Sequence, residues 1–156
     1  MIEIFSDVSF NQQTKKCFGA YIICGGTPEF DLQTMQLPCN HTSNSEVIIA
    51  GRALKRVLEI YPNETIIQHI DVPETKSIIN KFVKRNNQSM IEFKNNLTLP
   101  NVKLWCNARA YNRYSMCHYA ARCAAQGRHI DKATLKSINR PNKADYHETK
   151  PSKSKD

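Results

Sequence analysis

An acidic residue interrupts an apolar, strand-like run at the start of the chain. The run Ile2–Phe10 is rich in Val, Ile and Phe and carries Asp7 near its middle, and such alternating β-branched and aromatic residues favour a strand. A second run of this kind, Cys17–Cys24, follows a polar turn, so the two are predicted to pair as a hairpin. A carboxylate in a central strand is expensive to bury unless it meets a cation, faces water or caps a turn. Asp7 is therefore the first candidate for a metal ligand.

Composition is that of one globular domain. The chain has 156 residues, of which 40% are hydrophobic and 23% charged. It holds no run of 18 apolar residues, so we expect no membrane span. It also has no basic stretch followed by an apolar one near its start, so we expect the protein to stay inside the cell, in the cytoplasm or nucleus, or inside a virus-infected cell. The six cysteines have no zinc-ligand spacing and are predicted to be reduced and mostly buried.

The charge is uneven along the chain. The formal net charge of +8 permits a polyanionic partner, and residues 128–156 hold eight Lys or Arg against four Asp or Glu. The end of the sequence is also poor in apolar residues. We therefore expect a folded domain over residues 1–127 and a basic, largely disordered tail over residues 128–156.

The remaining periodicities predict an α/β fold. They indicate three further strands, over Glu29–Leu37, Thr65–Asp71 and Val102–Cys106. The predicted helices cover Ser45–Tyr61, a segment opened by Pro73 and ending near Lys84, a short stretch within 85–100, and Tyr111–Gln126, which Gly127 ends. With right-handed crossovers, these form a five-stranded mixed sheet, three antiparallel strands and then parallel ones, flanked by helices. The first strand is central, which places Asp7 beside Asp71.

Several of these segments resemble type 1 ribonuclease H (RNase H) domains. Glu3–Ser9 resembles the opening strand of that family, and Ser43–Glu46 with Ala53 and Leu54 resembles its helix bearing the second acid. Ile66–Asp71 resembles its fourth strand, which bears the third acid. Cys117–Arg122 resembles the final helix, with His118 where the family usually has an Asp. The resemblance covers about residues 1–125 and implies an RNase H-like fold.

The same resemblance implies a metal-dependent endonuclease that cuts the RNA strand of RNA/DNA hybrids. It implies two Mg²⁺ or Mn²⁺ ions, with Asp7 bridging both, Glu46 and Asp71 each binding one, and His118 as the fourth ligand. Hard divalent ions prefer carboxylate oxygens, and paired ions activate a water and stabilise the leaving oxygen. A histidine is neutral and has a borderline nitrogen donor, so it suits Mn²⁺ better than Mg²⁺.

Candidate contacts to nucleic acid lie in three places. Asn44 is in the loop where the family contacts the backbone, and an amide there could donate to phosphate or to the 2′-hydroxyl. Lys81, Lys84 and Arg85 form a basic stretch, which is either a duplex-binding patch or a solvated helix face. Arg109 and Arg113 flank the proposed site. The expected partner is an RNA/DNA hybrid or another nucleic-acid duplex, bound by a monomer.

Each of these assignments has a plainer alternative. Glu46 forms a capping box with Ser43, and Asp71 could be the N-cap of the next helix. His118 could be a packed or surface histidine, and His69 is interpreted as structural. At the level of function, the alternatives are a structure-specific DNA nuclease of the same fold, a catalytically impaired nucleic-acid-binding module, and an interaction domain whose acids are caps.

Overall fold

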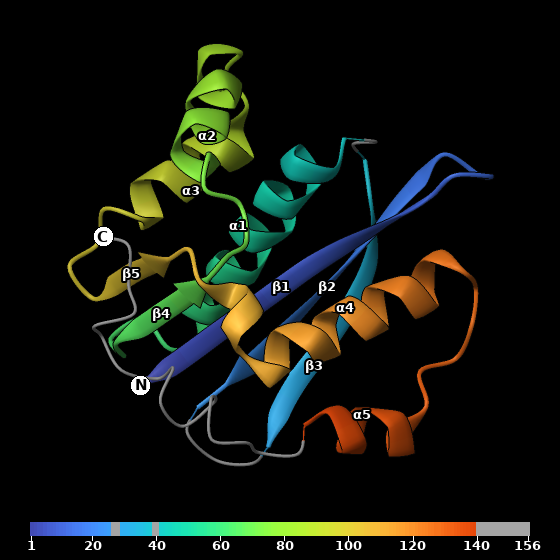
Figure 1. Cartoon of the computed structure of the whole chain (residues 1–156). Coiled ribbons are helices and arrows are strands. Elements are labelled where there is room, and N and C mark those ends of the chain that lie inside the picture. Colours follow the sequence, from blue (N-terminus) through green and yellow to red (C-terminus); the bar gives the residue numbers. More distant parts are fainter. Residues whose placement is uncertain (26–28, 39–40, 140–156) are drawn as a thin grey trace.

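The computed structural model describes residues 1–25, 29–38 and 41–139, and its centre is a five-stranded sheet (Figure 1). The strands are β1 (Ile2–Asn11), β2 (Lys16–Cys24), β3 (Phe30–Leu37), β4 (Ile66–His69) and β5 (Val102–Trp105), in the order β3-β2-β1-β4-β5. β1, β2 and β3 are antiparallel, whereas β4 and β5 run parallel to β1. The predicted mixed sheet with a central first strand is confirmed. The Gly–Gly–Thr–Pro segment 25–28, whose composition predicts a turn, lies outside the described residues from position 26 onward.

The helices also follow the predicted order. They are α1 (Thr42–Ile60), α2 (Thr75–Lys84), α3 (Gln88–Asn96), α4 (Asn112–Ala125) and α5 (Lys132–Ile138), with a 3-10 turn, η1 (Ala108–Ala110), before α4. The prediction that Pro73 opens a helix is wrong, because α2 begins at Thr75 after a turn. Gly127 adopts a φ of 65°, a left-handed conformation that glycine reaches without strain, and it follows the end of α4 as predicted.

α5 extends the folded part beyond residue 127. Asp131 is its N-cap, since the carboxylate accepts hydrogen bonds from the backbone N–H of Thr134 at 3.1 Å and from the Thr134 hydroxyl at 2.6 Å. Leu135 is buried in the same cluster as Met116 and Ala120 of α4. The start of the segment expected to be a tail therefore contains a packed helix, and residues 140–156 lie outside the described part.

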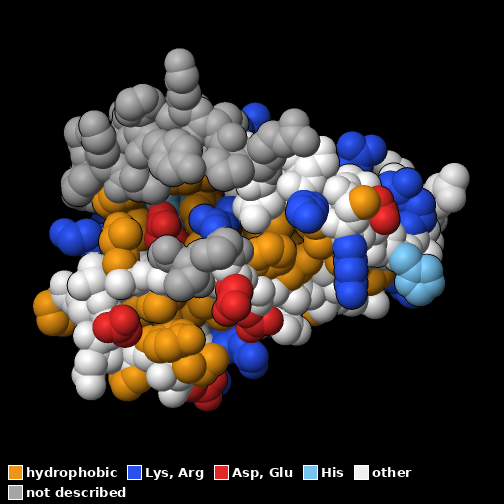
Figure 2. Space-filling view, turned by 90° about the horizontal axis from the view of Figure 1, so that it is seen from below, with side chains coloured by type: hydrophobic (Ala, Val, Ile, Leu, Met, Phe, Trp, Pro, Cys, Tyr) orange, Lys and Arg blue, Asp and Glu red, His pale blue; other side chains and the backbone are white. Residues whose placement is uncertain are grey.

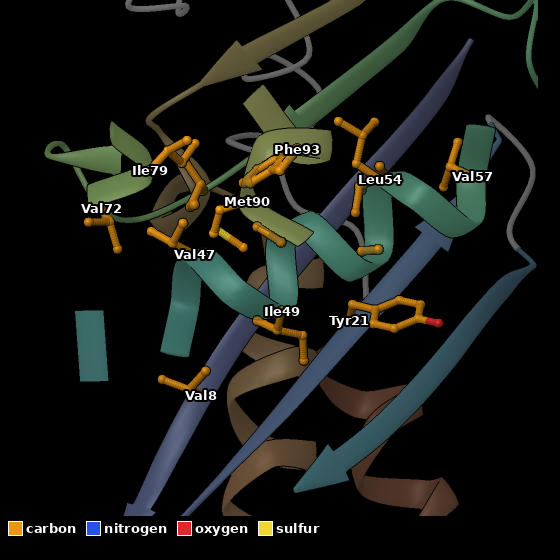
Figure 3. Close-up of a cluster of buried hydrophobic side chains, with 14 of the residues drawn as sticks. Val8, Tyr21, Val47, Ile49, Leu54, Val57, Val72, Ile79, Met90 and Phe93 are labelled. Atoms are coloured by element: carbon orange, nitrogen blue, oxygen red, sulfur yellow. The ribbon is translucent and has the colours of Figure 1, made fainter. Parts of the chain in front are cut away.

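Two hydrophobic clusters lie on opposite faces of the sheet. The larger contains the inner faces of α1, α2 and α3, and Figure 3 shows part of it, including Val8, Ile49, Leu54, Ile79, Met90 and Phe93. The smaller contains Phe5, Ala20 and Ile22 of the sheet with side chains of α4 and α5. β1 is buried from Ile2 to Val8 because it lies between the two. This double cover explains why the polar residues Glu3, Ser6 and Asp7 are buried along with the apolar residues of β1.

Strand register determines where the acids lie. Phe5 of β1 is opposite His69 of β4 in a parallel pair, so two residues further on Asp7 and Asp71 occupy neighbouring positions. Five cysteines in the described part are free, four of them buried, and Cys39 lies outside that part. Within the described ranges, no helix has the length and apolar character needed to cross a membrane.

Candidate active site

Asp7 is the buried centre of the site. Its residue is only 3% exposed, on the sheet face that α4 covers. The Tyr114 hydroxyl donates to Asp7 Oδ1 at 3.1 Å, and His118 Nδ1 lies 2.7 Å from Asp7 Oδ2, where an imidazole N–H donates to the carboxylate. Tyr114 and His118 are four residues apart on α4, so they lie one turn apart on the same helix face. Both oxygens of the buried carboxylate thus have donors, which offsets the free energy of burying it.

Asp71 joins the site from the residues after β4. Arg109, in η1, donates from Nε to Asp71 Oδ2 at 2.7 Å, and the Tyr114 hydroxyl lies 3.2 Å from the same oxygen. The side chain of Asp71 is 19% exposed, whereas that of Arg109 is 78% exposed. The alternative of Asp71 as a helix N-cap is wrong, because the N-cap of α2 is Glu74.

Glu46 reaches the site from the first turns of α1. The pKa of its carboxyl is raised to about 8, first by burial and then by the charges of Asp7 and Asp71 nearby, while Arg109 lowers it. The capping-box alternative is not observed, because the N-cap of α1 is His41, whose Nδ1 accepts from the Asn44 N–H at 3.4 Å. Glu46 is therefore engaged with Asp7, as expected of clustered acids.

Tyr114 is the site residue that the sequence analysis missed. Its hydroxyl bridges Asp7 and Asp71, and burial together with the charges of those acids and of Glu46 raises its pKa well above 10.0. It therefore stays protonated and donates a hydrogen bond at neutral pH. The sequence feature that could have identified Tyr114 is its position four residues before His118, which places both side chains on one face of the helix, the face expected to meet the acids.

The site brings together all four predicted ligand positions, in a compact arrangement closed by hydrogen bonds. Asp7, Glu46 and Asp71 offer the oxygen donors that Mg²⁺ and Mn²⁺ prefer, and the charges of Asp7 and Asp71 act on the carboxyl of Glu46 strongly enough to raise its pKa. Nowhere in residues 1–25, 29–38 and 41–139 do three or more His, Cys, Asp or Glu side chains surround a common position as metal ligands do. The three carboxylates are thus of the donor type that divalent cations prefer, but in this structure hydrogen bonds from Tyr114, His118 and Arg109 organise the acids.

Three of the predicted nucleic-acid contacts line one cavity. Asn44, Lys81 and Arg85 surround a volume of about 400 Å³ between the start of α1 and α2, together with His41, Ser43, Glu74, Ser77, Ile78 and Phe82. The positive end of a 19-residue helix and two cations therefore meet at this cavity. A phosphate is the kind of group that such a surface attracts.

The other predicted contacts lie elsewhere. Lys84 is exposed at the end of α2 and does not line this cavity. Arg109 is paired with Asp71. Arg113 lies close enough to Cys24 for its charge to lower the pKa of that thiol. Burial raises the same pKa more strongly, and the resulting value is about 12. The structure therefore places three of these six residues at one cavity and Arg109 at the acidic site, whereas Lys84 and Arg113 lie at neither position.

A buried polar chain lies beneath the acids. His69 is fully buried, with Nε2 2.9 Å from Glu3 Oε2 and Nδ1 3.2 Å from Asn107 Oδ1. Its ring stacks on Phe5 with centroids 4.3 Å apart. These contacts join β1, β4 and the turn before Arg109, so His69 has the structural role expected of it.

Solved structures place this architecture among known folds. The RNase H domain of prototype foamy virus is 14% identical over 66% of this chain and 76% of that one, with a TM-score of 0.49. The prototype foamy virus protease-reverse transcriptase is 15% identical over 84% of this chain and 21% of that one, with a TM-score of 0.54.

A third structure is similar over nearly its whole length. LC9-RNase H1, a type 1 RNase H with the type 2 active-site motif, is 10% identical over 92% of this chain and 89% of that one, with a TM-score of 0.55. No protein-family model matches the sequence, and no curated protein matches it. At these identities the likeness concerns architecture, and this chain has an RNase H-like fold.

Proposed function

We propose that the chain is a metal-dependent endonuclease that hydrolyses the RNA strand of RNA/DNA hybrids. The observation that carries the proposal is the convergence of acids from separate elements: one hydroxyl, that of Tyr114, lies 3.1 Å from Asp7 and 3.2 Å from Asp71. Glu46 of α1 is near enough that the charges of both acids add to burial in raising the pKa of its carboxyl. Acids crowded in this way are unfavourable without a proton or a cation between them. The likeness in fold to LC9-RNase H1, a type 1 RNase H, supports the same function.

The proposed cofactor is a pair of Mg²⁺ or Mn²⁺ ions. Asp7 would bind both, Glu46 and Asp71 would each bind one, and His118 would be the fourth ligand. When bound, such ions lower the pKa of an attacking water and stabilise the leaving oxygen of the phosphodiester. Within the chain, Arg109 orients the Asp71 carboxylate, and the burial of Asp7 keeps its position fixed.

The proposed substrate contact is the cavity beside α1. Lys81 and Arg85 would bind backbone phosphate, and the side-chain amide of Asn44 would donate to phosphate or to a 2′-hydroxyl. Glu46 lies in the same first turns of α1 as Asn44, so a backbone held in the cavity would continue toward the acids. Because such contacts involve only the sugar-phosphate backbone, the binding would be independent of base sequence.

A second candidate is a nucleic-acid-binding module with an impaired site. Two observations favour it: the Tyr114 hydroxyl occupies oxygen lone pairs of Asp7 and Asp71, and Arg109 is paired with Asp71, which offsets its negative charge. The histidine at position 118, where the resemblance implies an acid, would also leave less negative charge for a cation. In this case the cavity would still bind a duplex, without cleavage.

Cleavage assays separate the two candidates. Labelled RNA/DNA hybrid, double-stranded RNA and branched DNA are each incubated with the full chain and millimolar Mg²⁺ or Mn²⁺. We expect cleavage of the RNA strand of the hybrid, with Mn²⁺ more effective than Mg²⁺, and loss of cleavage in Asp7→Asn with hybrid binding retained. Cleavage of branched DNA alone would identify a structure-specific DNA nuclease. If neither metal gives cleavage or raises the melting temperature, the metal-dependent proposal is wrong.

A further inference from the structure

A second cavity lies at the other end of the sheet from Asp71. It has a volume of about 460 Å³ and is lined by the start of β1, the end of β2, the start of β3 and the residues after α1. β4 begins at Ile66, two residues after Glu64 of this cavity, and runs away from it toward Asp71. The cavity is therefore separate from the candidate active site. We call the surface formed by Gly25, Glu29, Asp31, Ile60, Tyr61 and Glu64 the acidic-apolar patch.

Large hydrophobic side chains are exposed on this patch. Ile60 is 49% exposed, and Tyr61, the next residue in the chain, is 39% exposed. Met1 and Leu99 are the remaining exposed large hydrophobic residues of the described part. Exposed large hydrophobic residues are ordinarily scattered singly, so an adjacent pair at the mouth of a cavity indicates a surface that becomes covered. Figure 2 views the molecule from this end and shows hydrophobic side chains beside Asp and Glu.

The charge of the patch is opposite to that of the chain. Glu29, Asp31 and Glu64 line the cavity, and among its described lining residues there is no Lys or Arg. Arg56 reaches Asp31 at 3.4 Å, in a pair exposed enough to be weak. The last turn of α1 has no basic residue, so the negative end of the helix adds to these acids. A chain with a formal net charge of +8 thus carries a locally negative surface.

We infer that the acidic-apolar patch binds a basic segment of a partner protein that carries an aliphatic anchor. The anchor would lie against Ile60 and Tyr61, and flanking Lys or Arg side chains would pair with Glu29, Asp31 and Glu64. The apolar and the acidic residues of the patch together define this partner. The acids would repel a nucleic acid, and a purely apolar partner would cover the acids without pairing them. The inference is independent of the proposed nuclease activity.

Fluorescence anisotropy with the full chain tests the chemistry of the partner. The probe is a labelled peptide of alternating Lys and Leu. Its controls are the same peptide with Glu in place of Lys, and the same peptide with Ser in place of Leu. We expect the Lys–Leu peptide to bind at least tenfold more tightly than either control, and more weakly as salt increases. Absence of binding below about 1 mM, or equal binding of the three peptides, overturns the inference.

Matched variants test the location. Ile60→Ser and Glu64→Lys should each weaken binding of the Lys–Leu peptide at least tenfold. Leu99→Ser, an exposed position outside the cavity, and Asp7→Asn, in the other acidic cluster, should leave it unchanged. Circular dichroism checks that each variant folds. Loss of binding in Asp7→Asn alone would place the peptide at the active site and overturn the inference, as would self-association of the chain that Ile60→Ser abolishes.

Discussion

Asp7 combines burial with an unusual number of polar neighbours. A carboxylate that is 3% exposed requires donors or a cation, and here Tyr114, His118 and the proton of Glu46 supply them. The same oxygens are those that a divalent cation would bind. Protons and a cation therefore compete for one set of lone pairs, and this competition predicts how the site responds to pH and to substitution.

Protonation of Glu46 links stability to pH. Its pKa is 4.5 in an unfolded chain and about 8 in the folded one, first because of burial and then because of Asp7. The folded chain thus binds a proton that the unfolded chain has lost, so the free energy of unfolding should fall as pH rises from about 5 to 8, by on the order of 1 kcal/mol for this partly buried group.

Urea denaturation without divalent metal, between pH 5 and 9, measures this dependence. The side chain of Glu46→Gln stays neutral at every pH, so this variant should lack the fall in the free energy of unfolding that the Glu46 carboxyl causes. At pH 8.5 the variant should therefore be more stable than the unmodified chain. Glu59→Gln, an exposed glutamate of the same helix, is the control and should leave the slope unchanged. Parallel slopes in all three proteins would contradict the assignment.

The Tyr114 hydroxyl should compete with metal binding. Tyr114→Phe keeps the ring and removes the donor shared by Asp7 and Asp71. Because a hydrogen bond to a charged group contributes about 1.5–3 kcal/mol, its removal should raise the affinity for Mn²⁺ about tenfold or more in calorimetric titration. Tyr119→Phe is the control, since that hydroxyl accepts from Asp131 away from the site. An unchanged or weaker affinity in Tyr114→Phe would rule out competition.

Helix termini illustrate how local signals succeed and fail. Ser43 and Glu46 match a capping box, yet α1 begins earlier, with His41 as its N-cap. The earlier start leaves Glu46 free to turn toward Asp7. α3, by contrast, has the cap that its sequence favours: Asn87 Oδ1 accepts from the Met90 N–H at 3.1 Å.

Loss of that cap should weaken the packing of α3. Met90 and Phe93 are 2% and 1% exposed and join α3 to the larger core. Asn87→Ala should lower the free energy of unfolding by about 1 kcal/mol, measured by urea denaturation. Gln88→Ala changes an exposed side chain at the next position and should have little effect. Equal changes in the two variants would argue against a role for the cap.

α1 separates two surfaces of opposite charge. Its 19 residues span about 28 Å, from the cavity of Lys81 and Arg85 at one end to Ile60 of the acidic-apolar patch at the other. The helix dipole has the same polarity as the side-chain charges, positive at the first cavity and negative at the second. The two ends of α1 therefore differ in charge in the sense that the two proposed contacts require, an anion at the first cavity and a cationic partner at the second.

Salt dependence should report the anionic contact. The double variant Lys81→Ala/Arg85→Ala removes both cations of the first cavity, so the slope of log affinity against log salt for hybrid binding should become shallower by about 1–2. The affinity at 50 mM salt should fall about tenfold or more. Lys132→Ala/Lys136→Ala removes two exposed cations of α5 and is the control. Equal effects of the two double variants would mean that only net charge matters.

Periodicity along the chain was enough to predict the architecture. Alternating apolar residues predicted β1, β2 and β3, and three- and four-residue steps predicted α1 and α4, because these patterns follow from how each element buries one face. The resemblance to RNase H domains then brought Glu46 and His118 together with Asp7 and Asp71. α5 was missed, since a seven-residue helix with Leu135 as its single buried side chain has almost no periodic signal.

By itself, the sequence determined the order of the elements, the central position of β1 and the identity of the acids. The tertiary structure alone decided which donors meet those acids, because Tyr114 and Asp7 are 107 residues apart and their contact depends on how α4 packs on the sheet. It also decided that Asn44, Lys81 and Arg85 line one cavity while Arg109 pairs with Asp71. Burial patterns are local and repeat along the chain, whereas side-chain partners are set by packing between distant elements.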